Sequence, residues 1–213
     1  MEVLGERWSL LVVRELMFGP MRFSAIRREL PGISARVLTE RLATLEAAGV
    51  VRLRELPPPV NARAYGLTEL GQAAAPVLRE LVQWAMKSEG HNSTLPMTAS
   101  AFMQSLQFSL QRGAARAVEG MVVELRIGPH SFAGRIGRDG FVAERREAPE
   151  ADIAISAENA NAMLGVFYGR APLGYWLDGS DARRLTGDRE RFEQFRAAFA
   201  WPAKLGGPRT ASS

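Results

Sequence analysis

GERWSLLVVRELMFGPMRFSAIRRELPGISARVLTERLATLEAAGVVRLRE, residues 5–55, is a run of three amphipathic segments separated by turn residues. In the first segment apolar side chains recur at helical spacing, which predicts a helix that ends at Gly19-Pro20. A short second helix is expected from Ser24, and Pro31-Gly32 turns the chain after it. The sequence therefore predicts closely spaced helices.

The third segment carries the clearest helix signals. Ser34 is a residue type that caps helix N-termini, and Gly49 is the type that commonly follows a helix C-terminus. Between them Leu38, Leu42 and Leu45 lie at positions i, i+4 and i+7, so they share one face. We expect that face to enter a core and the opposite face to meet solvent.

The residues after this helix predict a hairpin and a further helix. VVRLREL at 50–56 and RAYGLT at 63–68 are strand-like, and Pro57-Pro58-Pro59 between them predicts a rigid turn. Thr68 is expected to cap one long helix that runs to about Lys87. Three helices, a hairpin and a helix, in this order, are typical of a mainly-α winged helix-turn-helix.

Positive charge is concentrated in the same part of the chain. From Arg22 to Tyr65 there are eight arginines against four glutamates, a difference of +4 that equals the net charge of the whole protein. Neutralisation of phosphates by such a cluster supplies most of the non-specific affinity of a protein for DNA. The alternative interpretation is that these arginines only solvate helix faces.

Helix-turn-helix proteins contact base edges through residues near the start of the recognition helix. The third helix therefore offers Ser34, Arg36 and Thr39 to a DNA groove, whereas Arg41 suits a phosphate or a glutamate partner. Residues near the hairpin tip suit the phosphate backbone or the adjacent minor groove. The complete set of candidate DNA contacts is Arg22, Ser34, Arg36, Thr39, Arg41, Arg54, Asn61 and Arg63.

Several motifs in this region occur together in a known family. They are a Gly-x-x-Trp opening, a Gly-Pro-x-Arg-Phe turn, a Leu-Pro-Gly-Ile-Ser helix entry and an x-Tyr-x-Leu-Thr-x-x-Gly close. Through them residues 3–86 resemble the HxlR-type regulators, which are relatives of the MarR winged-helix group. The resemblance implies a homodimer that binds a roughly palindromic operator on double-stranded DNA, with two recognition helices in successive major grooves.

Two departures from this family matter. Its members usually carry more residues before the Gly-x-x-Trp helix, often including a cysteine, whereas this sequence contains no cysteine. Sensing through a thiol is therefore excluded, and dimer contacts made by that longer stretch are in question. Leu81 and Trp84 on the last winged-helix helix would support a dimer instead; the alternative is that they pack internally.

The polar segment GHNSTLPMT at 90–98 is expected to link a winged-helix domain at 1–89 to a second domain at 99–200, which a tail at 201–213 follows. In the second domain an amphipathic helix precedes the strand-like stretches MVVELRI, SFAGRIG, FVAERRE and ADIAISA, with a hairpin turn at 138–140. Helices and a short strand around ARRLTGD follow. This pattern predicts an α+β domain with an antiparallel sheet covered by helices.

The order Ala-Asp-Ile-x-Ile, helix, Asp-Gly, Thr-Gly-Asp, helix resembles the sterol carrier protein-like fold over residues 99–200. That resemblance implies an apolar tunnel for a lipid or a similar ligand. The candidate lining residues are Met103, Leu106, Phe132, Ile136, Ile155, Met163, Phe167 and Trp176. The alternative is that the same side chains form an ordinary packed core.

Other functional classes lack support. The sequence has no nucleophile elbow, no Gly-rich phosphate loop and no cluster of metal ligands, so we expect no catalytic residues, no metal site and no cofactor. Its two imidazoles, His91 and His130, are expected in surface turns. No apolar run approaches the roughly 18 residues of a membrane span, and the start lacks a signal-peptide pattern. We expect a cytoplasmic protein without membrane insertion.

The prediction is a DNA-binding transcriptional regulator whose second domain senses an apolar small molecule or lipid. Two alternatives stay open. In one, the chain is a lipid or small-molecule binding protein whose winged helix mediates protein contact. In the other, the second domain serves only dimerisation.

Overall fold

The computed structural model describes residues 3–56, 61–92, 94–169, 172–177 and 182–205. The chain divides into two compact units, Met1–Arg79 (the N-terminal unit) and Glu80–Ser213 (the C-terminal unit). The division falls within helix α5 (Ala75–Lys87), and the polar segment 90–98 follows that helix in the C-terminal unit.

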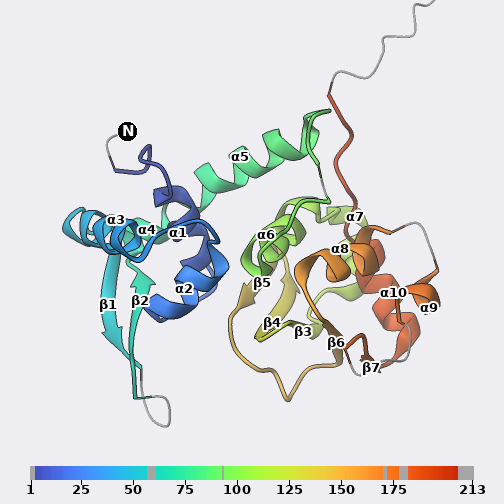
Figure 1. The fold of residues 1–213 in the computed structure, drawn as a ribbon. Helices are drawn as coiled ribbons and strands as arrows, with labels where there is room; N and C mark the ends of the chain where they lie inside the picture. The colour runs from blue at the N-terminus through green and yellow to red at the C-terminus, as the bar shows by residue number, and fades with distance from the viewer. Residues whose placement is uncertain (1–2, 57–60, 93, 170–171, 178–181, 206–213) are drawn as a thin grey trace, which may run out of the picture. The chain divides into compact units, whose positions relative to one another are not determined.

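The N-terminal unit has the element order of a winged helix-turn-helix (Figure 1). Before α5 its elements are α1 (Ser9–Leu16), α2 (Phe23–Glu29), α3 (Ala35–Ala47), β1 (Val51–Glu55), β2 (Arg63–Leu67) and α4 (Glu69–Gln72). The two strands are antiparallel, with Val51 opposite Leu67 and Glu55 opposite Arg63. The predicted proline turn at 57–59 lies outside the described residues.

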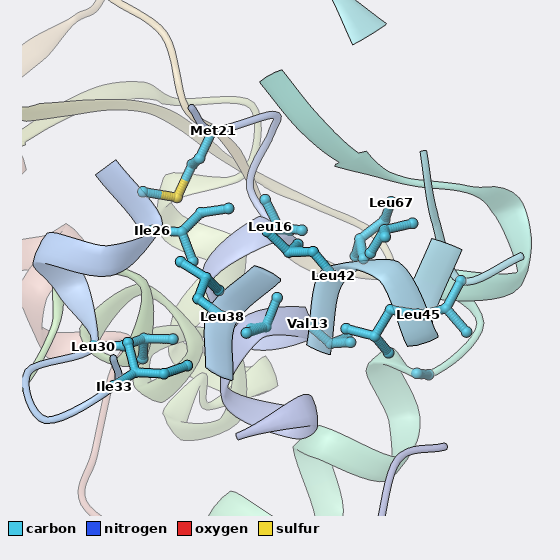
Figure 2. Packing of buried hydrophobic residues seen from close by; sticks show 14 of the residues in the cluster. Val13, Leu16, Met21, Ile26, Leu30, Ile33, Leu38, Leu42, Leu45 and Leu67 are labelled. Carbon is cyan, nitrogen blue, oxygen red and sulfur yellow. The ribbon is translucent and has the colours of Figure 1, made fainter. Parts of the chain in front are cut away.

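Apolar side chains from α1, α2, α3 and the hairpin meet in one core (Figure 2). Leu38, Leu42 and Leu45 are at most 1% exposed, which confirms the face predicted for the third helix. Val13 and Leu16 of α1 are also fully buried in this core. Burial of each such side chain stabilises the fold by roughly 1.5–3 kcal/mol. The core therefore holds α3 with its opposite face in solvent.

The helix ends follow the predicted capping residues. The Ser34 hydroxyl accepts a hydrogen bond from the Val37 amide at 3.2 Å, and this bond starts α3. Gly49, just after α3, has a φ of +70°, a left-handed conformation that glycine adopts without a steric penalty. The Thr68 hydroxyl accepts from the Gly71 amide at 3.1 Å and caps α4.

The single long helix predicted after Thr68 is wrong, because the chain breaks between α4 and α5 at Ala73-Ala74. Pro76 lies in the first turn of α5. Proline has no amide hydrogen, and its ring clashes with the carbonyl four residues earlier, here that of Gln72. A proline is tolerated at the start of a helix, so a new helix begins where the old one must stop.

The C-terminal unit is an α+β domain built on a five-stranded sheet of order β5-β4-β3-β6-β7. Its strands are β3 (Val122–Ile127), β4 (His130–Gly137), β5 (Gly140–Glu144), β6 (Ile153–Ala157) and β7 (Leu185–Gly187). Its helices after α5 are α6 (Ala99–Ser109), α7 (Arg112–Ala115), the 3-10 turn η1 (Arg116–Val118), α8 (Ala160–Tyr168), α9 (Leu173–Trp176) and α10 (Arg189–Ala197). The short α7–η1 segment has no counterpart in the sequence prediction.

The prediction of an antiparallel sheet is wrong for one pair of strands. β3 and β6 are parallel, with Val123 opposite Ile153. The connection 145–152 returns the chain from the end of β5 to the start of β6, and its Ala148 amide donates to a Glu124 carboxylate oxygen at 3.4 Å. Glu124 is consequently only 2% exposed, although it lies on the opposite face of β3 from the buried Leu125. Strand periodicity predicts which face a side chain occupies but not the direction of the neighbouring strand.

Phenylalanine rings fill the space between the sheet and its helices. Phe102 meets Phe167 edge-on with ring centroids 5.5 Å apart, and Phe199 meets Phe195 at 5.0 Å. Such edge-to-face contacts add about 0.5–1.5 kcal/mol each beyond the burial of area. The ring cluster consists of Phe102, Phe141, Phe167, Phe192, Phe195 and Phe199, all of them buried.

Candidate nucleic-acid interface

Helix α3 carries the polar face that is predicted from the sequence to contact a DNA groove. Ser34, Arg36 and Thr39 are all exposed at its N-terminal end, while the leucines of the opposite face lie in the core. The side chain of Arg36 is 88% exposed. The N-terminal turn of a helix also carries partial positive charge, which favours an adjacent phosphate.

The polar side chains of this face bind neighbouring groups of the same helix. The Arg36 Nε donates to the Glu40 carboxylate at 2.9 Å, one helical turn along, and this hydrogen bond, followed by the charge of Glu40, raises the pKa of Arg36. Thr39 donates its hydroxyl hydrogen to the Ala35 carbonyl at 3.0 Å. The bond to Glu40 uses only the Nε–H of the Arg36 guanidinium, whose other four N–H donors can serve a further acceptor.

Arg41 has a structural partner outside α3. Its guanidinium donates to the Glu6 carboxylate at 3.0 Å, and its side chain is only 19% exposed. The bond ties α3 to the segment before α1. Of the two roles weighed for Arg41 from the sequence, the structure displays the glutamate pairing.

The hairpin carries three further candidates. The Arg54 guanidinium donates to the Leu67 carbonyl at 3.1 Å, so this side chain folds back across the neighbouring strand. Arg63 lies opposite Glu55 in the register of the two strands. Asn61 is exposed with a φ of +36°, a left-handed conformation that asparagine tolerates better than most residues.

The structure adds exposed arginines that the candidate set left out. Arg22, a candidate, is exposed directly before α2, and Arg27 and Arg28 on α2 are exposed as well. Arg52 on β1 is also exposed. Their signal was present in the charge count of this region. Seven of the eight arginines between residues 22 and 65 are exposed, and Arg41 is the exception.

The eight residues proposed to line an apolar tunnel lie in the C-terminal unit. Seven are at most 5% exposed and pack among themselves and the phenylalanine cluster: Met103, Leu106, Phe132, Ile136, Ile155, Met163 and Phe167. The eighth, Trp176, is half-buried, with its ring against Gly165 of α8 and Gly169, the residue that follows this helix.

Both imidazoles, His91 and His130, lie in the C-terminal unit. In the described part of the chain no group of three or more His, Cys, Asp or Glu residues is arranged to hold a metal ion. The surface turn expected for His130 is wrong, because this residue starts β4 and is 9% exposed. Burial, followed by the charge of Lys204, lowers the pKa of His91. Among the described helices none has the length and apolar character needed to span a membrane.

The fold and the exposed cationic face of the N-terminal unit define a winged helix-turn-helix DNA-binding protein. Residues 3–93 match the HxlR-like helix-turn-helix family. The uncharacterized HTH-type transcriptional regulator YvaP of Bacillus subtilis is 44% identical over 84 residues, which are 39% of this chain and 78% of that protein. The HTH-type transcriptional regulator YodB of the same organism is 41% identical over 83 residues, 39% of this chain and 74% of the relative.

The match with the solved structure of the reduced form of YodB from B. subtilis spans 43% of this chain and 89% of the YodB chain, with 37% sequence identity and a TM-score of 0.38. On the sequence match, this chain belongs to the HxlR-like helix-turn-helix family, whose members are DNA-binding transcriptional regulators.

Proposed function

We propose that this protein binds a specific operator as a homodimer and that its C-terminal unit adjusts this binding in response to a small molecule. The observation that carries the DNA-binding part is the exposed face of α3 with arginines on both sides of it in the sequence. Ser34, Arg36 and Thr39 contact the major groove in this proposal. Arg22, Arg54, Asn61 and Arg63 contact backbone or minor groove, and Arg41 holds α3 in place through Glu6.

Fluorescence anisotropy with the DNA upstream of the protein's own gene tests the DNA-binding part. We expect the upstream fragment to be preferred over random DNA by about 1,000-fold or more, the lower end for specific regulators. The logarithm of affinity should fall linearly with the logarithm of salt concentration, because released counterions drive phosphate binding. Absence of binding to either DNA at low salt would refute the proposal.

Two substitutions separate base from phosphate contacts. Arg36→Ala is expected to weaken operator binding by about 1–3 kcal/mol and to relax specificity, because a base-reading side chain is lost. Arg63→Ala is expected to weaken binding to the operator and to random DNA by the same factor. It should also reduce the slope of log affinity against log salt concentration by about 1. Arg146→Ala removes an exposed arginine of the C-terminal unit and serves as the charge-matched control.

The dimer part rests on one apolar stripe along α5. Val77, Leu81 and Trp84 lie at positions i, i+4 and i+7, and their exposed fractions are 51%, 43% and 71%. Exposed tryptophans are uncommon without a partner, and a self-complementary stripe suits a two-fold interface. Trp84→Ala should shift the protein to monomers in sedimentation equilibrium and weaken operator binding, whereas Tyr175→Ala, an equally exposed aromatic elsewhere, should change neither.

The effector part rests on the C-terminal unit, for which we propose a sterol carrier protein-like fold. A ligand changes DNA affinity only if it binds one arrangement of the dimer better than the other. Apolar candidate effectors are therefore added to the anisotropy assay at a protein concentration near the operator Kd, where a change in affinity changes the fraction of DNA bound. If no effector changes operator affinity and a chain lacking residues 97–213 becomes monomeric and loses DNA affinity, the second domain serves dimerisation alone.

A further inference from the structure

A hollow of about 280 Å³ opens on the C-terminal unit beside the α7–η1 segment and the turn between β4 and β5. Its apolar lining consists of the half-buried Leu110 and the buried Ala115 and Ile136. Gly137 and Gly140 complete the strand side, and a Cβ built on either would meet no atom within 4 Å. The volume is near the lower end of the range for small-molecule sites, about 300–1,000 Å³.

Backbone hydrogen bonds fix the surroundings of this hollow. The Gln111 amide donates to the Ala198 carbonyl at 2.7 Å, which ties the entry of α7 to the end of α10. The Gly120 amide donates to the Ile136 carbonyl at 2.8 Å, which ties the exit of η1 to β4. These bonds join the α7–η1 segment to α10 and β4, and a site held by rigid elements loses less conformational freedom on binding.

The charged lining of the hollow is cationic. Arg112, Arg116 and Arg138 belong to it, against the single carboxylate of Glu119, a difference of +2. Glu119 lies 3.9 Å from Arg138 and partly offsets that charge. No described residue forms a hydrogen bond or ion pair with the guanidinium of Arg112 or Arg116. Two exposed guanidinium groups one helical turn apart are thus available to a ligand.

We propose that this hollow binds a small amphipathic anion, a carboxylate or phosphate ester with a short apolar chain. Planar guanidinium groups match the paired oxygens of such anions and form charge-assisted hydrogen bonds with them. The apolar lining beneath takes the chain out of water. The hollow lies outside the buried phenylalanine cluster, so binding displaces no packed side chain. Its role as the effector site rests on the proposed function, whereas ligand binding itself does not.

Calorimetric titration of the full-length protein with sodium octanoate, in the absence of DNA, tests this inference. The neutral analogue 1-octanol has the same chain without the charge. We expect one octanoate per chain and an affinity at least about tenfold higher than for 1-octanol, because hydrogen bonds to charged groups carry the difference. Octyl phosphate, as a second probe, should bind at least as tightly as octanoate.

Three variants locate the site. Arg112→Gln/Arg116→Gln is expected to weaken octanoate binding about tenfold or more. Arg135→Gln, an exposed arginine of β4 that does not line the hollow, should stay within twofold of the wild type. Leu110→Ala keeps the charge but removes an apolar side chain from the lining, so it should also weaken octanoate binding.

Four outcomes would overturn the inference. They are equal binding of octanoate and 1-octanol, no detectable binding of octanoate at millimolar concentration, an unchanged affinity in Arg112→Gln/Arg116→Gln, and loss of DNA affinity in that variant with octanoate binding intact. The last outcome would assign the two arginines to a nucleic-acid surface. Because the titration contains no DNA, its result is independent of whether operator binding succeeds or fails.

Discussion

Substitution of Gly71 by alanine tests how the wing is joined to the recognition helix. Gly71 lies in the first turn of α4, and its amide donates a hydrogen bond to the Thr68 hydroxyl. The same hydroxyl donates to the Gly49 carbonyl at 2.5 Å. A Cβ at residue 71 would lie 2.2 Å from the Val50 carbonyl oxygen and 3.1 Å from the Leu67 side chain. The first obstacle is backbone, which cannot rotate away.

The geometry sets the size of the effect. A carbon–oxygen contact needs roughly 3.3 Å, so α4 must move by about 1 Å from the end of α3. Overpacking of this kind costs about 1–3 kcal/mol, against the 0.5–1 kcal/mol that alanine gains over glycine within a helix. For a unit of this size each kcal/mol corresponds to about 4–8 °C in Tm. Because the obstacle is backbone, the cost lies toward the upper end of its range and a net loss of about 1–2 kcal/mol remains, so we expect Gly71→Ala to lower the Tm of the N-terminal unit by roughly 5–15 °C.

Scanning calorimetry gives the Tm, and hydrogen exchange of peptides from β1 and β2 assigns the shifted transition to the N-terminal unit. Gln72→Ala, the exposed next residue of the same helix, is the matched control and should melt within about 2 °C of the wild type, as surface substitutions do. A Gly71→Ala protein as stable as this control would show that the close approach of α4 to Val50 is not a structural requirement.

Ser34→Ala removes the α3 cap and should lower the free energy of unfolding by about 1 kcal/mol in urea denaturation, whereas Ser34→Asp should retain it. Leu106→Ala should cost about 2–5 kcal/mol, since Leu106 is fully buried; a loss below about 1 kcal/mol would instead indicate an open cavity there. The pKa of His91 lies below 6.5 in the folded state, so its contribution to stability is complete above pH 6.5 and is lost as pH falls through the folded pKa. NMR titration should place the His91 midpoint below that of the denatured chain, and His91→Gln should remove this part of the acid sensitivity.

Local signals predicted the N-terminal unit well. Ser34, Gly49 and Thr68 act through hydrogen bonds or φ angles that involve residues close in sequence, so their residue types alone identify the helix ends. Leu38 and Leu42 lie one turn apart on α3, and periodicity alone assigns them to the core. The break before α5 was also a local feature, since Pro76 cannot occupy a helix interior.

Eight candidate DNA contacts were named from the sequence, and seven of them are exposed on the N-terminal unit. Their number and sign are properties of the sequence, and the exposure of α3 follows from its buried leucines. The partners of two of them are not sequence properties. Arg41 pairs with Glu6, 35 positions away, and Arg54 bonds the Leu67 carbonyl across the hairpin, so only the folded chain shows which cations are already engaged.

By itself the sequence determined the winged-helix order, the family and the cationic character of the first half, because these depend on periodicity, capping residues and charge within short stretches. Only the tertiary structure decided that β6 lies parallel to β3, that Glu124 is buried beneath the chain around Ala148, and that Arg116 and Ile136 line one hollow. The physical reason is that strand direction and the joining of distant segments depend on the path of the connections. Packing selects that path among residues far apart in sequence, and local pattern does not encode it.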